Sequence, residues 1–139
     1  METEFELVIG SDIAQIPAFS DRLEEAMLAN GFSSDEILDT QLAVEEAITN
    51  VIVHGYGRQG EPIMISCRIS TDRAEVQIAD SAPRFDPLSV PEPDVGEGIE
   101  QRDVGGLGVY LIRQVMDEVS YRYEDGENIL ILLKKRRDE

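Results

Sequence analysis

The chain has little of what several protein classes require. Its 139 residues include one cysteine, Cys67, so a disulfide within the chain is excluded and a reducing, cytoplasmic setting is expected. No long apolar run follows the acidic start, so we expect neither a signal peptide nor a membrane span. Basic residues are scarce: 12 Lys and Arg stand against 29 Asp and Glu, a formal net charge of −17. This charge argues against nucleic acid or an anionic membrane as a partner. It fits a basic partner protein or simply a solvated acidic surface.

Apolar periodicity and turn signals predict the order strand, helix, helix, strand, strand, loop, helix, strand, strand. The approximate ranges of these elements are 5–9, 12–30, 34–55, 63–69, 74–79, 80–103, 105–117, 119–123 and 128–133. Cys67 lies in an apolar strand pattern and is expected to fill core space. We predict a single domain over residues 1–139 with an α/β two-layer sandwich fold, in which a mixed, mainly antiparallel sheet carries helices on one face.

The second predicted helix is apolar nearly all round, which is typical of a buried helix. A narrow polar stripe interrupts it, made of Asp39, Glu46, Asn50 and His54. Such groups are costly to bury without water, a metal ion or a ligand as partners, so we expect the stripe to line a pocket. Glu46 can act as a general base, the amide oxygen of Asn50 suits Mg²⁺, and His54 could touch a phosphate. An exposed polar face is the alternative.

Two more features can carry chemistry. Asp80 directly follows an apolar strand and can accept a hydrogen bond from an exocyclic amine such as that of adenine; an ordinary turn-starting aspartate is the alternative. Gly105-Gly106-Leu107-Gly108 opens the next helix, where glycines allow close approach and free N–H groups suit phosphate. This run lacks the spacing of a Walker A loop or a dinucleotide fingerprint, and a glycine-rich hinge is its alternative.

In combination, these features resemble the GHKL ATPase superfamily, and most closely its bacterial anti-sigma-factor serine kinases. The resemblance is carried by VEEAITNVIVHGY (44–56), DSAPRFDP (80–87) and GGLGVYLIRQVMDEVSY (105–121). It implies that Glu46 is the catalytic base, that Asn50 coordinates Mg²⁺ beside the ATP phosphates, and that Asp80 binds the adenine amine. Gly106 and Gly108 would pack against the phosphates, and the loop before them, 88–103, would be the ATP lid.

The chain departs from the superfamily pattern at Ala82, where relatives have a glycine lining the adenine pocket, and in its acidic lid. The residues expected to bind nucleotide are Asn50, His54, Asp80, Ala82, Gly105, Gly106, Leu107 and Gly108.

The resemblance implies an ATP- and Mg²⁺-dependent protein-serine kinase that is also an anti-sigma factor. Its partners would be a sigma factor and a STAS-type anti-anti-sigma protein that carries the target serine, and it would form a homodimer. The alternative is a non-catalytic module that keeps the fold and sequesters a protein partner. A histidine-kinase ATP-binding domain is a weaker alternative, because the sequence lacks a histidine-bearing dimerisation helix.

Overall fold

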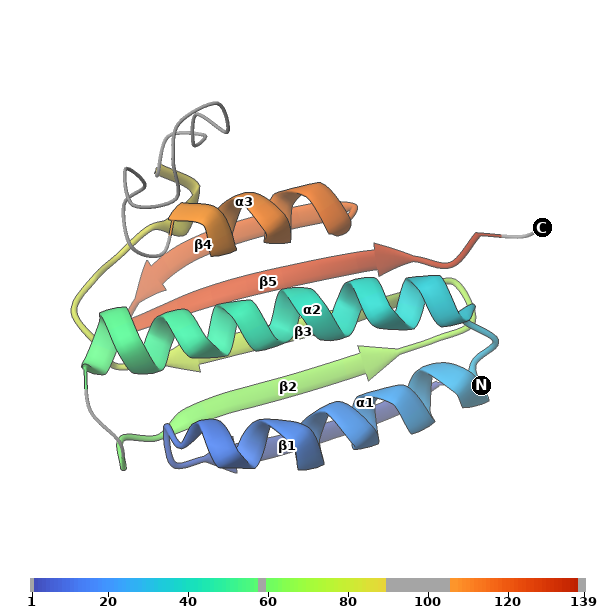
Figure 1. The fold of residues 1–139 in the computed structure, drawn as a ribbon, viewed down its shortest axis with the longest axis horizontal. Helices are drawn as coiled ribbons and strands as arrows, with labels where there is room; N and C mark the ends of the chain where they lie inside the picture. The colour runs from blue at the N-terminus through green and yellow to red at the C-terminus, as the bar shows by residue number, and fades with distance from the viewer. Residues whose placement is uncertain (1, 58–59, 90–105, 138–139) are drawn as a thin grey trace.

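The structure, a computed structural model, describes residues 2–57, 60–89 and 106–137. A five-stranded sheet in the order β1-β2-β3-β5-β4 forms one layer, and helices cover one of its faces (Figure 1). The strands are β1 (Thr3–Ile9), β2 (Ile63–Ile69), β3 (Arg73–Asp80), β4 (Glu118–Glu124) and β5 (Glu127–Lys135). The helices are η1 (Ile13–Gln15), α1 (Ile16–Ala29), α2 (Ser34–Asn50), η2 (Val51–Tyr56), η3 (Pro87–Ser89) and α3 (Gly106–Val115). The two-layer sandwich is confirmed, and every strand pairing within the described residues is antiparallel.

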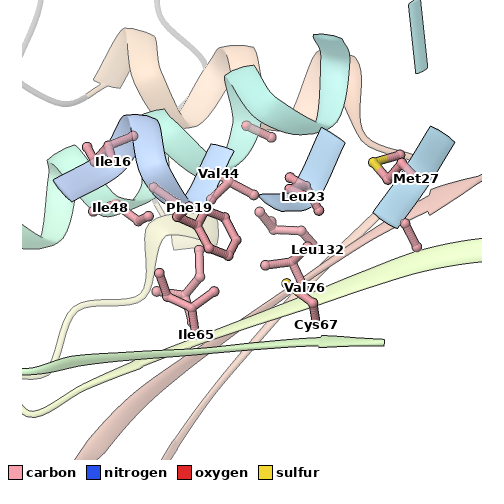
Figure 2. Packing of buried hydrophobic residues seen from close by; sticks show 14 of the residues in the cluster. Ile16, Phe19, Leu23, Met27, Val44, Ile48, Ile65, Cys67, Val76 and Leu132 are labelled. Atoms are coloured by element: carbon pink, nitrogen blue, oxygen red, sulfur yellow. The ribbon is translucent and has the colours of Figure 1, made fainter. Parts of the chain in front are cut away.

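The core lies between the sheet and the helices because alternate residues of each strand face the helical layer. Figure 2 shows Phe19 and Leu23 of α1 and Val44 of α2 packed over Ile65 and Val76 of the sheet. Cys67 occupies the same layer, and burial raises the pKa of its thiol to about 12. The cysteine is therefore a protonated core residue, as its strand position predicted.

Helix α2 begins where the sequence predicts it, and α1 begins later than predicted. Ser33 Oγ accepts a hydrogen bond from Glu36 N at 3.2 Å, and Glu36 Oε1 accepts one from Ser33 N at 2.8 Å. This reciprocal pair is the capping box expected at the start of α2. Asp12 caps the short η1 turn instead of α1, which starts later with Pro17 in its first turn. A proline fits there because the first helical N–H groups have no partner within the helix.

The expectation that α2 is buried nearly all round is wrong. Leu38 is 62% exposed, Leu42 37% and Val53, in the following turn η2, 47%. The helix lies on the sheet with α1 and α3 beside it (Figure 1). Its outer face therefore meets solvent even though that face carries Leu38 and Leu42. Of the helices that the structure describes, none is long and apolar enough to cross a membrane.

The basic residues at the end of β5 anchor the strand to the helical layer. Lys134 points inward with its side chain 7% exposed, and its Nζ lies 2.9 Å from Asp39 Oδ2 and 2.7 Å from the carbonyl oxygen of Val115. A cation at the last carbonyl of α3 also favours the negative end of the helix dipole. Arg137 N donates to Glu36 Oε2 at 2.8 Å. These residues are therefore structural, whereas the sequence suggested only a basic tail.

Two adjacent lysines give a matched test of this anchor. Lys134→Met should lower the free energy of unfolding by about 1–3 kcal/mol, because it leaves the Val115 carbonyl and Asp39 without their donor. Lys135→Met removes only an exposed pair with Glu118 at 3.7 Å and should cost less than about 1 kcal/mol. Urea denaturation measures both. Equal losses would contradict the anchoring role of Lys134.

Candidate active site

A pocket lies between the helical layer and the ends of β3 and β5, with about 490 Å³ of empty space when the part open to solvent is included. Its walls are mainly apolar side chains from α2, η2, α3, β4, β5 and the segment after β3. The polar groups Asn50, Asp80 and Asn128 interrupt these walls. An apolar pocket with a few convergent polar groups is the usual form of a small-molecule site.

Asp80 ends β3 with only 6% of its surface exposed and lines the pocket. Its Oδ1 accepts hydrogen bonds from Asn128 Nδ2 and from Ala82 N, both at 3.0 Å. Burial raises the pKa of the Asp80 carboxyl above its usual value, with a smaller upward effect from Glu127, while these two hydrogen bonds act in the opposite direction. The side chain is thus an acceptor held at the base of an apolar pocket, as a partner for an amine would be.

Asn128 was not anticipated from the sequence, yet it organises this end of the pocket. Antiparallel pairing places it opposite Asp80, and its Nδ2 also donates to the carbonyl oxygens of Ala82 at 3.0 Å and Pro83 at 3.3 Å. Its Oδ1 accepts from Phe85 N at 3.0 Å and from the Tyr121 hydroxyl at 2.6 Å. The available signal was an asparagine on the inward face of an otherwise apolar strand.

Tyr56, at the end of η2, was also missed. Its hydroxyl accepts from Ser81 N at 2.7 Å and donates to the carbonyl oxygen of Pro62 at 2.8 Å. The residue after Asp80 is therefore tied to the end of the helix and to the segment that enters β2. Burial raises the pKa of the Tyr56 phenol, so it remains a donor at neutral pH.

Glu46 and Asn50 meet the start of α3 at Gly108. A Cβ atom on Gly108 would lie 2.9 Å from Glu46 Oε2 and 3.5–3.6 Å from the amide atoms of Asn50. Only a glycine lets α3 approach these side chains so closely. Glu46 and Asn50 are half-exposed, and their side chains make no hydrogen bond or ion pair with the described residues. Their polar atoms are available to a ligand.

The predicted polar stripe divides in the structure. Asp39 pairs with Lys134, away from the pocket. His54 is exposed and does not line the pocket, because η2 is a π-helical turn. A π-turn closes hydrogen bonds over five residues instead of four, so it shifts the angular position of His54 from the one that a continuous α-helix would give it.

The remaining nucleotide-site predictions fall on the pocket wall and on α3. Ala82 is buried in the wall, and its methyl group fits because Gly55 beside it has no side chain: a Cβ there would lie 3.1 Å from that of Ala82. Gly106 and Leu107 form the start of α3. Gly105 and nearly all of the predicted lid, 88–103, lie outside the described residues.

The chain has the two-layer sandwich fold, and its pocket has the form of a small-molecule site. Residues 9–134 match the histidine kinase-like ATPase domain family, and the chain belongs to this family. The resemblance found in the sequence is thereby confirmed.

Two similar curated proteins carry the name serine-protein kinase RsbW. That of Listeria monocytogenes is 36% identical over 106 residues, which cover 73% of this chain and 68% of the relative. That of Bacillus cereus is 32% identical over 124 residues, which cover 85% and 78%.

A solved structure, of the RsbU and RsbW domains of Rv1364c from Mycobacterium tuberculosis, matches with a TM-score of 0.67 and 14% identity. The match covers 98% of this chain but 33% of that one, so this chain spans about a third of its length. At this identity, the likeness concerns the fold alone.

Because Asp80 is buried, we predict that the effect of replacing it on stability depends on pH. Asp80→Asn should raise the free energy of unfolding at neutral pH, because the amide oxygen can still accept from Asn128 and Ala82 while no charge is buried. The folded-state pKa of Asp80 is raised, so protonation favours the folded wild type, and the advantage of the variant should shrink as pH falls toward that pKa.

Urea denaturation between neutral pH and about pH 4, close to the ordinary carboxyl pKa, measures this difference. Asp72→Asn, at an exposed turn position, is the matched control and should change little at any pH. If Asp80→Asn is less stable than wild type at neutral pH, the charge of Asp80 does not lower the free energy of unfolding.

Proposed function

We propose that the protein is an ATP-dependent protein-serine kinase that also acts as an anti-sigma factor. The observation that carries this proposal is the juxtaposition of two sites along α2. The carboxylate of Glu46 and the amide of Asn50 face the start of α3 at Gly108, and Asn50 also lines the pocket that ends at Asp80. Membership of the ATPase family and the name serine-protein kinase borne by the relatives support it.

The pocket suits the adenine base of ATP, and the start of α3 suits its phosphates. Adenine would lie between the apolar walls with its amine directed at Asp80. The phosphates would then extend along Asn50 toward α3, whose first N–H groups have no partner within the helix and carry the positive end of its dipole. Gly108 permits this approach because no side chain separates the helix from Asn50.

Asn50 is the residue that would hold Mg²⁺. Its amide lines the pocket and makes no hydrogen bond with the described residues, so its oxygen can coordinate an ion. Within the described parts of the chain, no group of three or more His, Cys, Asp or Glu side chains could hold a metal. A single amide oxygen from the protein fits Mg²⁺, which keeps several waters and shares phosphate oxygens. When bound, the ion would neutralise charge on the phosphates.

Glu46 is the proposed catalytic base. Its carboxylate would accept the proton of the substrate serine hydroxyl as the serine oxygen bonds to the γ-phosphorus of ATP and ADP departs. It lies beside Asn50 on the same helix and makes no ion pair within the described residues, so it can reach a hydroxyl presented from outside. His54 is exposed and does not line the pocket, so its contact with a phosphate stays a prediction.

The partners we propose are a sigma factor and a STAS-type anti-anti-sigma protein that carries the target serine, with the kinase acting as a homodimer. A net charge of −17 favours a partner with a basic face and should accelerate its association at low salt. The decisive experiment incubates the protein with Mg²⁺-ATP and STAS proteins from the same genome and detects phosphoserine by mass spectrometry. Partner binding without phosphotransfer would favour the non-catalytic module.

Asn50 links the metal to nucleotide binding. Mg²⁺-ATP should raise the melting temperature more than ATP alone, because a tighter ligand stabilises the folded state further by mass action. Asn50→Ala should remove most of that Mg²⁺-dependent increment while leaving the smaller effect of ATP alone. Thermal unfolding with and without chelator measures this. Thr49→Ala, the neighbouring position outside the pocket, should keep the full increment.

Glu46→Gln separates binding from chemistry. The amide keeps the shape of the side chain but cannot take a proton, so phosphotransfer should fall by about 10²–10⁴-fold with little change in ATP affinity. Glu45→Gln makes the same change at the preceding residue and should retain activity. The Oε2 atom of Glu45 accepts a hydrogen bond from Ser20 Oγ. An equal loss in both variants, or none in Glu46→Gln, would remove Glu46 from the catalytic role.

A further inference from the structure

We propose that Asn128 is a positioning residue that makes the pocket select adenine over guanine, by controlling how many oxygens Asp80 offers to the base. This inference rests on the proposed nucleotide-binding function. Asn128 contributes to the pocket from β5, the strand paired with the β3 strand that carries Asp80. It depends on the hydrogen bonds around the carboxylate, on the fixed orientation of the amide, and on the different donors of the two purines.

The carboxylate of Asp80 has one oxygen engaged and one available. Asn128 Nδ2 and Ala82 N both donate to Oδ1 at 3.0 Å. No donor among the described residues reaches Oδ2, and Asp80 lines the pocket. The two oxygens of the carboxylate are equivalent, so a rotation that exchanges them gives the same hydrogen bonds. As long as Asn128 is in place, the carboxylate therefore offers one available oxygen to the pocket.

The amide of Asn128 has only one possible orientation. Phe85 N can only donate, and it lies 3.0 Å from the atom assigned as Oδ1. The Tyr121 hydroxyl donates to the same oxygen at 2.6 Å. On the other side, Nδ2 faces the carboxylate and the carbonyl oxygens of Ala82 and Pro83, all of which only accept. The side chain therefore directs its N–H groups at Asp80 and holds the Ala82–Pro83 wall in place.

A single acceptor suits adenine and does not suit guanine. The polar edge of adenine presents one amine donor, which the available oxygen can accept. Guanine presents two adjacent donors, its ring N–H and its amine, and a carboxylate with both oxygens available accepts both at once. Ala82 N and Asn128 Nδ2 together fill the two acceptor positions of Oδ1. Asn128 thereby prevents the two-point pairing with guanine and leaves the one-point pairing with adenine intact.

The test compares Mg²⁺-ATP and Mg²⁺-GTP affinities by calorimetry in the full chain. Asn128→Asp keeps the shape but, with both carboxylates ionised, replaces the donor with an acceptor and repels Asp80. Ala82 N is then the one described donor left on Oδ1, so one acceptor position of that oxygen becomes available. The ratio of ATP to GTP affinity should fall by about tenfold to a hundredfold, the range expected for losing a hydrogen bond to a charged group. Circular dichroism checks that the variant is folded.

Two further variants separate positioning from general stability. Tyr121→Phe removes one donor that orients the amide and leaves the rest of the network, so the ratio should fall in the same direction by about threefold, as for one weaker hydrogen bond. Asn30→Ala removes another buried asparagine, which donates to Thr3 and Ala26 outside the pocket. It should lower the melting temperature and leave the ratio unchanged.

The outcomes distinguish the inference from the function beneath it. A wild-type protein that binds neither nucleotide overturns both. A wild-type preference for ATP that Asn128→Asp retains, with both affinities falling equally, reduces Asn128 to a structural residue and overturns the inference alone. If Asn128→Asp does not fold, an unchanged ratio in Tyr121→Phe overturns it, and a reduced ratio supports it.

Discussion

The structure of the site depends on keeping the Asp80 carboxylate buried and still able to accept a hydrogen bond. Burial alone would favour its neutral form, so donors must come from groups that are themselves fixed. They come from Asn128 on the neighbouring strand and from Ala82 N, and Tyr56 holds the next residue, Ser81. Three parts of the chain that are distant in sequence therefore have to be assembled correctly before the pocket has a polar end.

Helix α2 serves the sheet and the site with different faces. Its inner face, with Val44 and Ile48, lies on the core, and the edge carrying Glu46 and Asn50 lies against α3 at Gly108. The π-helical turn η2 then changes the phase of the helix, which brings Gly55 against the pocket wall and directs His54 to solvent. Such turns are uncommon in regular helices and are frequent at functional sites.

Local signals were enough to predict the fold, because each element has its own. The capping box before α2, the alternation in β2 and the Asp-Gly turn between β4 and β5 all act over a few residues. For the candidate site, the sequence predicted that residues lie together only where they share one short motif, as Glu46 and Asn50 do on α2. Asn128, Tyr56 and the Asp39–Lys134 pair act through partners 25 to 95 residues away, and they depend on strand register and on helix phase, which no local pattern specifies.

The position of β5 within the sheet also determines when the protein can become functional during its synthesis. β5 lies between β3 and β4, both of which precede it in the chain. Until β5 emerges from the ribosome, the sheet formed by β1, β2 and β3 has an unpaired edge at β3, and β4 has no strand to pair with. Asp80 and Asn128 are 48 residues apart, so the nascent chain exposes the carboxylate well before its partner exists. Closing such long-range pairings is slow, so the β3 edge stays open to incorrect pairing during that interval.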